Sequence, residues 1–86
     1  VSNVLINEAC YIAGKVTNSV LFDQVIVEEG AVIENSVVLP GVTVEKGAHI
    51  VNCVVAENQV IEAGTKIGNL NDGKVYLVSE LGIEEE

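Results

Sequence analysis

Large aliphatic residues recur along the chain at intervals of six, six and five positions. The series comprises Val4, Cys10, Val16, Leu21, Val27, Ile33, Val38, Val44, Ile50, Val55, Ile61 and Ile67. Three intervals make a step of seventeen residues, and the same step relates Gly30, Gly47 and Gly64. A repeat of this length, rich in β-branched residues and poor in aromatic ones, is typical of one turn of a β-solenoid.

The spacing predicts three short strands in each turn and a triangular cross-section. Because side chains alternate across a strand, the residue two places before each lining position should also point inward. Most of these places hold small or β-branched residues such as Ser19, Ala31 and Ser36, and Gln59 is an exception. We therefore predict an all-β fold, a single-stranded parallel β-helix of hexapeptide-repeat type with about four triangular coils over residues 1–68.

Turn-forming residues occupy the predicted corners. Two corners of each turn have two residues, as in Glu29-Gly30 and Pro40-Gly41, and the third has one asparagine: Asn18, Asn35 or Asn52. Asparagine is the non-glycine residue that most readily adopts positive φ, so a one-residue corner favours it. The corners thus support the same register as the aliphatic series.

The repeat ends after Gly68. Residues 69–86 are predicted to form a connector over 69–73, one further strand over 74–78 and an acidic C-terminal tail from 79 to 86. We expect the extra strand to cover the edge of the last coil. Since exposed strand edges of a solenoid are normally covered and the repeat begins at residue 1, we also expect the chain to be a piece of a longer protein.

Composition and charge argue against several classes of function. Thirteen acidic residues against four lysines give a formal net charge of −9, which disfavours nucleic acid because phosphate contacts need a basic surface. The chain has no signal sequence and no apolar run long enough to span a bilayer, so we expect no membrane association and a cytoplasmic location. Cys10 and Cys53 lie on different sides of the predicted prism, too far apart for a disulfide, and are expected to be reduced core residues.

One predicted face has apolar residues at its outward positions. These residues are Val20, Phe22, Val37, Leu39, Val54 and Ala56. Exposed apolar patches of this kind usually mark an interface, although β-branched residues also favour strands in general. We predict that the six residues form an interface, because the other two faces carry Lys15, His49, Lys66, Glu34 and a column of stacked glutamates.

Stacked acids and a single histidine are the remaining candidates for chemistry. Glu28, Glu45 and Glu62 follow three successive lining residues, and we interpret them as a solvated acidic face rather than a metal site. His49 is predicted to point outward, whereas zinc enzymes of similar coil need three histidines. We predict no catalytic, cofactor-binding or metal-binding residue. The alternative is a hexapeptide-repeat acyltransferase fragment, with His49 as general base in a site between subunits.

Several segments resemble a known family. They are residues 3–6 (NVLI), 10–22 (CYIAGKVTNSVLF), 30–41 (GAVIENSVVLPG) and 47–53 (GAHIVNC). They are similar to the C-terminal β-helix of bacterial glucose-1-phosphate adenylyltransferase, also called ADP-glucose pyrophosphorylase, over about residues 2–68. The resemblance implies a left-handed coil and a parent enzyme that makes ADP-glucose from ATP and glucose 1-phosphate for glycogen synthesis.

In that family, catalysis belongs to an N-terminal nucleotidyltransferase domain. The resemblance therefore implies a non-catalytic domain for oligomerisation and regulation, with the catalytic domain of the parent chain and further subunits of a homo- or hetero-oligomer as partners. Effector sites of the family draw on Arg and Lys, whereas this chain has no Arg and four lysines: Lys15, Lys46, Lys66 and Lys74. Both the catalytic type of subunit and the regulatory type found in some bacteria are compatible with this composition.

Overall fold

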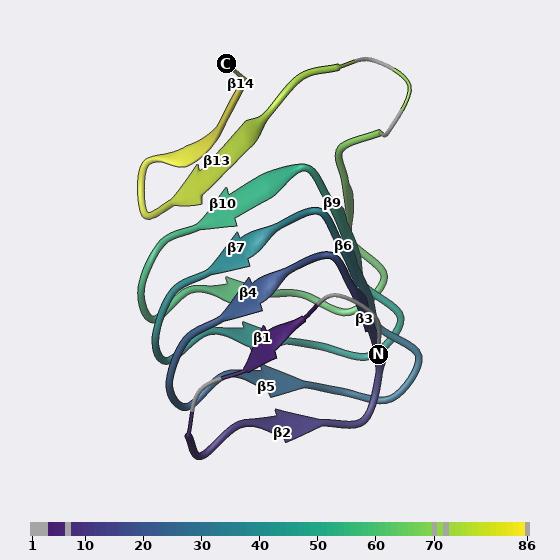
Figure 1. Ribbon diagram of the computed structural model, residues 1–86. Helices are drawn as coiled ribbons and strands as arrows, with labels where there is room; N and C mark the ends of the chain where they lie inside the picture. Colours follow the sequence, from purple (N-terminus) through teal and green to yellow (C-terminus); the bar gives the residue numbers. More distant parts are fainter. Residues whose placement is uncertain (1–3, 7, 70, 72, 86) are drawn as a thin grey trace.

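The structure, a computed structural model, describes residues 4–6, 8–69, 71 and 73–85. Within this part of the chain it has strands and turns but no helix, and hence no helix able to cross a membrane. Short strands follow one another around a coil and stack into three sheets (Figure 1).

Each sheet forms one side of the coil. The first sheet has the order β1 (Leu5–Ile6), β4 (Val20–Leu21), β7 (Val37–Val38), β10 (Cys53–Val55), β13 (Tyr76–Ser79) and β14 (Gly82–Glu85). The second sheet has the order β11 (Val60–Ile61), β8 (Thr43–Val44), β5 (Ile26–Val27) and β2 (Tyr11–Ile12). The third has the order β12 (Lys66–Ile67), β9 (His49–Val51), β6 (Val32–Glu34) and β3 (Lys15–Thr17). All neighbours are parallel except β13 and β14, which confirms the predicted all-β parallel β-helix.

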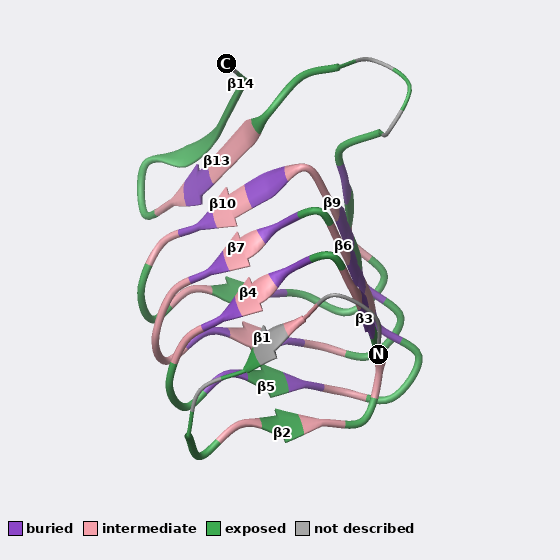
Figure 2. Cartoon of the chain, in the orientation of Figure 1, coloured by how far each residue is buried: buried purple, intermediate pink, exposed green. Residues whose placement is uncertain are grey.

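The predicted lining residues form the core. From Val16 to Ile67 every member of the series is buried, with 6 % exposure or less, and Ile33 pairs with Val16 and Ile50 at the expected step (Figure 2). The inner residues from Ser19 to Cys53 are buried beside them, while Gln59 and Thr65 are half-buried. Small residues at these places leave room for the aliphatic side chains that fill the narrow prism.

Two inner serines satisfy backbone groups that the sharp asparagine corners leave without a carbonyl partner. Asn18, Asn35 and Asn52 have φ of 48°, 48° and 54°, as the corner chemistry predicted. Directly after the second of these corners, the N–H of Ser36 donates to the hydroxyl of Ser19 at 3.1 Å. The two buried hydroxyls also donate to carbonyl oxygens two residues back along the chain, both at 2.8 Å. The two serines therefore have a structural role in an otherwise apolar interior, because they form hydrogen bonds with the backbone.

The first coil differs from the prediction. Ile6 pairs with Leu21 and Ile12 with Val27, so by register these two isoleucines, rather than Val4 and Cys10, continue the lining column. Ile12 packs against the core, whereas Ile6 is 39 % exposed. Val4 and Cys10 lie two places earlier, half-buried against the core. The step here is fifteen residues instead of seventeen, because the corner between Ile12 and Val16 is two residues shorter than its equivalents.

Gly14 makes this short corner possible. The chain passes directly over the corner of the next coil, and the N–H groups of Ala13 and Lys15 donate to Val27 and Ala31 carbonyl oxygens at 2.8 Å each. A Cβ at Gly14 would lie 2.4 Å from the oxygen of Ala31, closer than any ordinary contact. Only glycine fits at this close approach of two backbones.

The C-terminal segment forms a hairpin. β13 pairs in parallel with β10, so a further strand lies on the last coil in the first sheet. Residues 79–85, predicted as part of an acidic tail, instead include β14, which pairs antiparallel with β13 from Ser79↔Gly82 to Tyr76↔Glu85. A salt bridge between Lys74 and Glu85 joins its two ends. Pairing with β13 overrides the acidic composition, and the exposed glutamates of β14 give the sheet a charged edge.

Candidate interaction face

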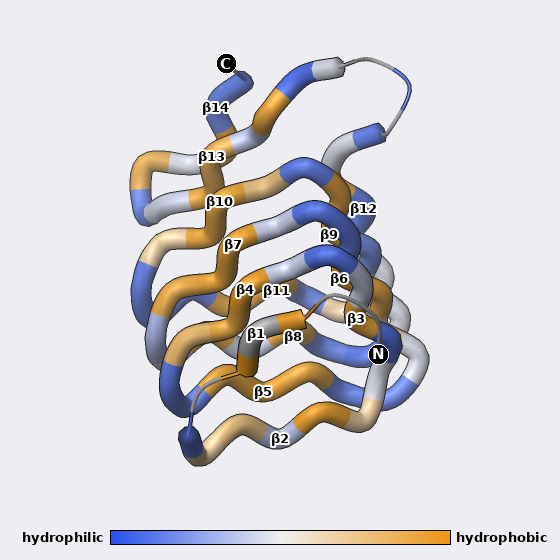
Figure 3. The backbone as a smooth tube through the Cα atoms, viewed as in Figure 1, coloured by the Kyte–Doolittle hydropathy of each residue, from blue (hydrophilic) through white to orange (hydrophobic). Residues whose placement is uncertain are grey.

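The six residues of the predicted interface lie together on the outer surface of the first sheet. Val20, Val37 and Val54 are Cα partners across β4, β7 and β10. Phe22, Leu39 and Ala56 each follow two residues later and therefore form a second column on the same surface. All six are half-buried, and Figure 3 shows the hydrophobic segments of β4, β7 and β10 stacked along this side. We call these six residues the apolar strip.

The apolar strip continues into the C-terminal hairpin through a residue that the sequence analysis missed. Leu77 of β13 pairs with Val54 and is half-buried. On its other side Leu77 pairs with Glu84 of β14, so a charged residue ends the apolar column. The chain leaves the coil between β12 and β13, and the step from Val54 to Leu77 is therefore longer than the repeat. Successive side chains of a strand point to opposite faces, so an inward Val78 places its neighbour Leu77 on the outer surface.

A second, largely apolar column interrupted by Thr43 lies on the second sheet, where the sequence analysis expected polar residues. Tyr11, Ile26, Thr43 and Val60 are Cα partners across this sheet. Tyr11 is 62 % exposed, Val60 57 % and Ile26 39 %. Each of these residues directly precedes a lining residue. Because side chains alternate along a strand, this position in the sequence already indicates that they point outward. The expectation that only one face is apolar was therefore wrong.

The stacked glutamates bond the backbone of the neighbouring coil. Glu28 Oε1 accepts the N–H of Lys46 at 3.2 Å, and Glu45 Oε1 accepts the N–H of Ala63 at 3.1 Å. These N–H groups lie in two-residue corners, where the turn leaves them without a carbonyl partner. Glu62, the next in the column, is exposed. The first two carboxylates thus serve as corner caps. Across the described residues, no group of three or more His, Cys, Asp or Glu side chains gathers at a metal-binding distance.

His49 lies in β9 on the outer surface of the third sheet and is exposed, as predicted. Its Cα partners in the neighbouring strands are Val32 and Lys66. Lys15 pairs with Val32 on the far side, so the column around His49 contains two lysines and one valine. A general base is commonly oriented by a carboxylate, and the residues of this column do not provide one.

Both cysteines are free thiols. Cys53 is buried, and its Sγ donates to the carbonyl oxygen of Val51 at 3.2 Å. Burial raises the pKa of this thiol to about 11, with the hydrogen bond to Val51 acting in the opposite direction. Cys10 is half-buried and donates to the carbonyl oxygen of Phe22 at 3.0 Å. Cys53 therefore remains a protonated, unreactive core residue at neutral pH.

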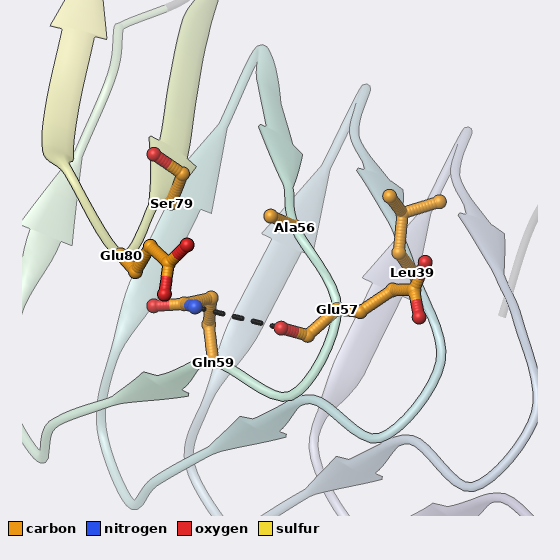
Figure 4. Close-up of a pocket in the computed structure, with 6 residues that line it drawn as sticks. All are labelled: Leu39, Ala56, Glu57, Gln59, Ser79 and Glu80. Atoms are coloured by element: carbon orange, nitrogen blue, oxygen red, sulfur yellow. Dashed lines mark hydrogen bonds between the residues drawn. The ribbon is translucent and has the colours of Figure 1, made fainter.

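A pocket of about 320 Å³ lies where the apolar strip meets the C-terminal hairpin (Figure 4). It is lined by Leu39, Ala56, Glu57, Gln59, Ser79 and Glu80. The first two belong to the apolar strip, the next two to the segment after β10, and the last two to the end of β13. Gln59 donates from its side-chain nitrogen to the carbonyl oxygen of Glu57 at 3.4 Å. The pocket thus joins an apolar wall to two carboxylates, a combination that suits a basic, partly apolar group.

A comparison of the sequence with known protein families supports the coiled fold described above. The family model described as GlmU-like, C-terminal hexapeptide matches residues 1–84, which include both the coil and most of the hairpin. No match was found among curated proteins. The family match supports the hexapeptide-repeat part of the resemblance, and it is not specific to ADP-glucose pyrophosphorylase. The three-sided parallel coil and the match together show that the chain belongs to the GlmU-like family of C-terminal hexapeptide domains, consistent with a left-handed β-helix.

Proposed function

We propose that this chain is a non-catalytic oligomerisation and regulatory domain of a sugar-nucleotide pyrophosphorylase. The parent enzyme would make ADP-glucose from ATP and glucose 1-phosphate in the cytoplasm for glycogen synthesis. Two findings support this proposal: the match to a hexapeptide family and the resemblance of residues 2–68 to the β-helix of glucose-1-phosphate adenylyltransferase. Its partners would be the N-terminal catalytic domain of the parent chain and other subunits of a homo- or hetero-oligomer.

The apolar strip is the observation that carries the proposal. The interior of the coil is filled by aliphatic side chains, so recognition falls to the outer faces. The apolar strip crosses three coils and continues to Leu77, which makes a contiguous apolar surface on one flat face. Surfaces of this kind usually serve as interfaces. Regulation would act through packing of this domain, because the chain has four lysines and no Arg with which to hold phosphorylated effectors.

Sedimentation velocity of the isolated chain tests the oligomerisation role. We expect the wild-type chain to self-associate and the Phe22→Asp/Leu39→Asp variant to be monomeric, since two buried carboxylates in an apolar contact are strongly unfavourable. The matched control is Tyr11→Asp/Val60→Asp, which places the same charges on the second sheet and should associate like wild type. An oligomer that survives the Phe22 and Leu39 changes would refute the role of the apolar strip.

An acyltransferase-type domain is the second candidate, and the GlmU-like family match supports it too. Its site would lie between subunits near His49, whose neighbours are Val32 and Lys66. Calorimetric titration with acetyl-CoA separates the two functions. We expect no measurable heat for the domain of a pyrophosphorylase, whereas saturable binding that is lost in His49→Ala would favour the acyltransferase.

A further inference from the structure

The pocket lies where the regular coil stops. The second sheet ends at β11, whereas the first sheet continues beyond β10 into β13 and β14. Ser79 and Glu80 at the end of β13 therefore line the pocket together with Glu57 and Gln59, which follow β10. The pocket volume of about 320 Å³ falls within the usual range for small-molecule sites, about 300–1,000 Å³.

Gln59 is the pocket residue that departs from the pattern of the coil. The equivalent inner positions one and two coils earlier hold Val42 and Val25, and both valines are fully buried. Gln59 is instead half-buried, and its side-chain nitrogen donates to the carbonyl oxygen of Glu57 at 3.4 Å (Figure 4). No donor among the described residues meets the side-chain oxygen of Gln59, so this oxygen is available as an acceptor.

Two carboxylates give the pocket its charge. Glu57 and Glu80 come from different segments, and Figure 4 shows their carboxylates on different sides of the pocket. Both residues are exposed, and neither forms a salt bridge with another described residue. Leu39 and Ala56 add an apolar wall. The pocket therefore combines separate negative charges with apolar surface.

We propose that this pocket binds a linear aliphatic diamine, with one ammonium group at each carboxylate and the methylene chain on the apolar wall. An ammonium group has three donors and no acceptor, which suits the two carboxylates and the Gln59 oxygen. The alkyl chain of a cationic group packs on apolar surface while its charged end reaches a carboxylate. The net charge of −9 also raises the concentration of cations around the chain.

Other classes of ligand suit the pocket less well. Metal ions such as Ca²⁺ take six to eight oxygen ligands, and the described residues bring no three acidic, histidine or cysteine side chains together. A metal ion would also make no use of Leu39 and Ala56. A neutral ligand would leave both carboxylates unpaired, and an anion would be repelled by them. The inference does not depend on the activity of the parent enzyme.

An NMR titration of the isotope-labelled 86-residue chain with 1,4-diaminobutane tests the proposal. We expect saturable changes of chemical shift at Gln59, Ser79 and Glu80. The dissociation constant should be at least about threefold lower than that of butylamine, which can form only one of the two ion pairs. Butane-1,4-diol and Mg²⁺ should cause no matching saturable change at these residues, because the first lacks charge and the second lacks an alkyl chain.

Three variants test the role of the named side chains. Glu57→Gln and Glu80→Gln should each raise the dissociation constant of the diamine by about threefold or more, because each removes one ion pair. Gln59→Val introduces the residue found at the equivalent positions one and two coils earlier, so it should keep the fold and weaken binding. Glu62→Gln removes the same charge from an exposed position outside the pocket and is the matched control, expected to bind like wild type.

Each result decides the inference. Absence of saturable binding would overturn it, as would equal affinity for butylamine or Mg²⁺. Equal weakening in Glu62→Gln and Glu80→Gln would also overturn it, because the diamine would then be attracted only by the acidic surface as a whole. Circular dichroism of every variant checks that the fold is kept, which we expect because the three glutamates are exposed.

Discussion

The hydroxyl of Ser36 accepts the backbone N–H of Cys53, one coil further on, at 3.2 Å. Ser19 does the same for Ser36 at 3.1 Å, so a column of side-chain bonds runs inside the coil behind the asparagine corners. Both bonds are buried. Their loss would leave a backbone donor unsatisfied in an apolar interior.

Replacing Ser36 with alanine should therefore be costly. We expect Ser36→Ala to lower the free energy of unfolding by about 1–3 kcal/mol, the usual range for a buried unsatisfied donor. Ser79→Ala is the control, because its hydroxyl accepts the N–H of Leu81 at an exposed turn and should contribute less than about 0.5 kcal/mol. Urea unfolding followed by circular dichroism measures both. Equal effects of the two changes would contradict the structural role of the inner serine.

Gly14 should tolerate no side chain. The Cβ of Gly14→Ala would lie 2.4 Å from the oxygen of Ala31, so two coils must move apart. We expect a loss of about 3 kcal/mol or more. At Gly47, where φ is +71° and a Cβ meets nothing within 4 Å, alanine should lower stability by about 1–2 kcal/mol through backbone strain alone. Thermal unfolding of both variants shows which substitution lowers stability more. A smaller loss of stability at Gly14 than at Gly47 would show that the first corner is wider than described.

The asparagine corners predict opposite responses to two substitutions. Asn35 has φ of 48°, which glycine adopts freely and alanine does not. Asn35→Ala should lose about 1 kcal/mol of unfolding free energy, while Asn35→Gly should stay within about 0.5 kcal/mol of wild type. The comparison can be made in one set of denaturant curves. If the Asn35→Ala variant were as stable as the Asn35→Gly variant, the positive φ assigned to this corner would be wrong.

Cys53 predicts a dependence of stability on alkaline pH. Burial raises the pKa of its thiol from 9.0 to about 11, so the folded protein holds this proton more tightly than the unfolded chain. The stability contributed by this group is fully present below pH 9.0 and falls as the pH rises toward about 11. We expect the difference in unfolding free energy between wild type and Cys53→Ala to shrink over this interval, by at most about 2 kcal/mol. A difference that is constant with pH would argue against a buried thiol.

The sequence predicted the coil well wherever the repeat is regular. From Val16 to Ile67, the interval of the aliphatic residues alone identifies the buried positions, because the interior of a narrow prism accepts little else. The first coil was misread because Cys10 and Ile12 are both apolar, and a corner shortened by two residues changes the register without changing the pattern. The hairpin was missed because pairing between β13 and β14 outweighs an acidic composition.

The candidate site was only partly predictable. The apolar strip follows from the repeat, since residues one step apart in sequence stack in space. The pocket does not, because it joins Leu39 to Glu80 through a hairpin whose position depends on the path of the connector after β12. The cap function of Glu28 and Glu45 also depends on side-chain geometry at the corners, which composition does not reveal.

The side-chain bonds behind the asparagine corners connect each coil only to its immediate neighbours, and the bond from Ser36 to Cys53 repeats the one from Ser19 to Ser36. Packing within each turn therefore sets the cross-section of the β-helix but does not set the number of its turns. A duplicated segment of seventeen residues, such as 35–51, would add one rung of about 4.8 Å without disturbing those on either side. The number of coils can therefore change by whole turns while the cross-section stays the same.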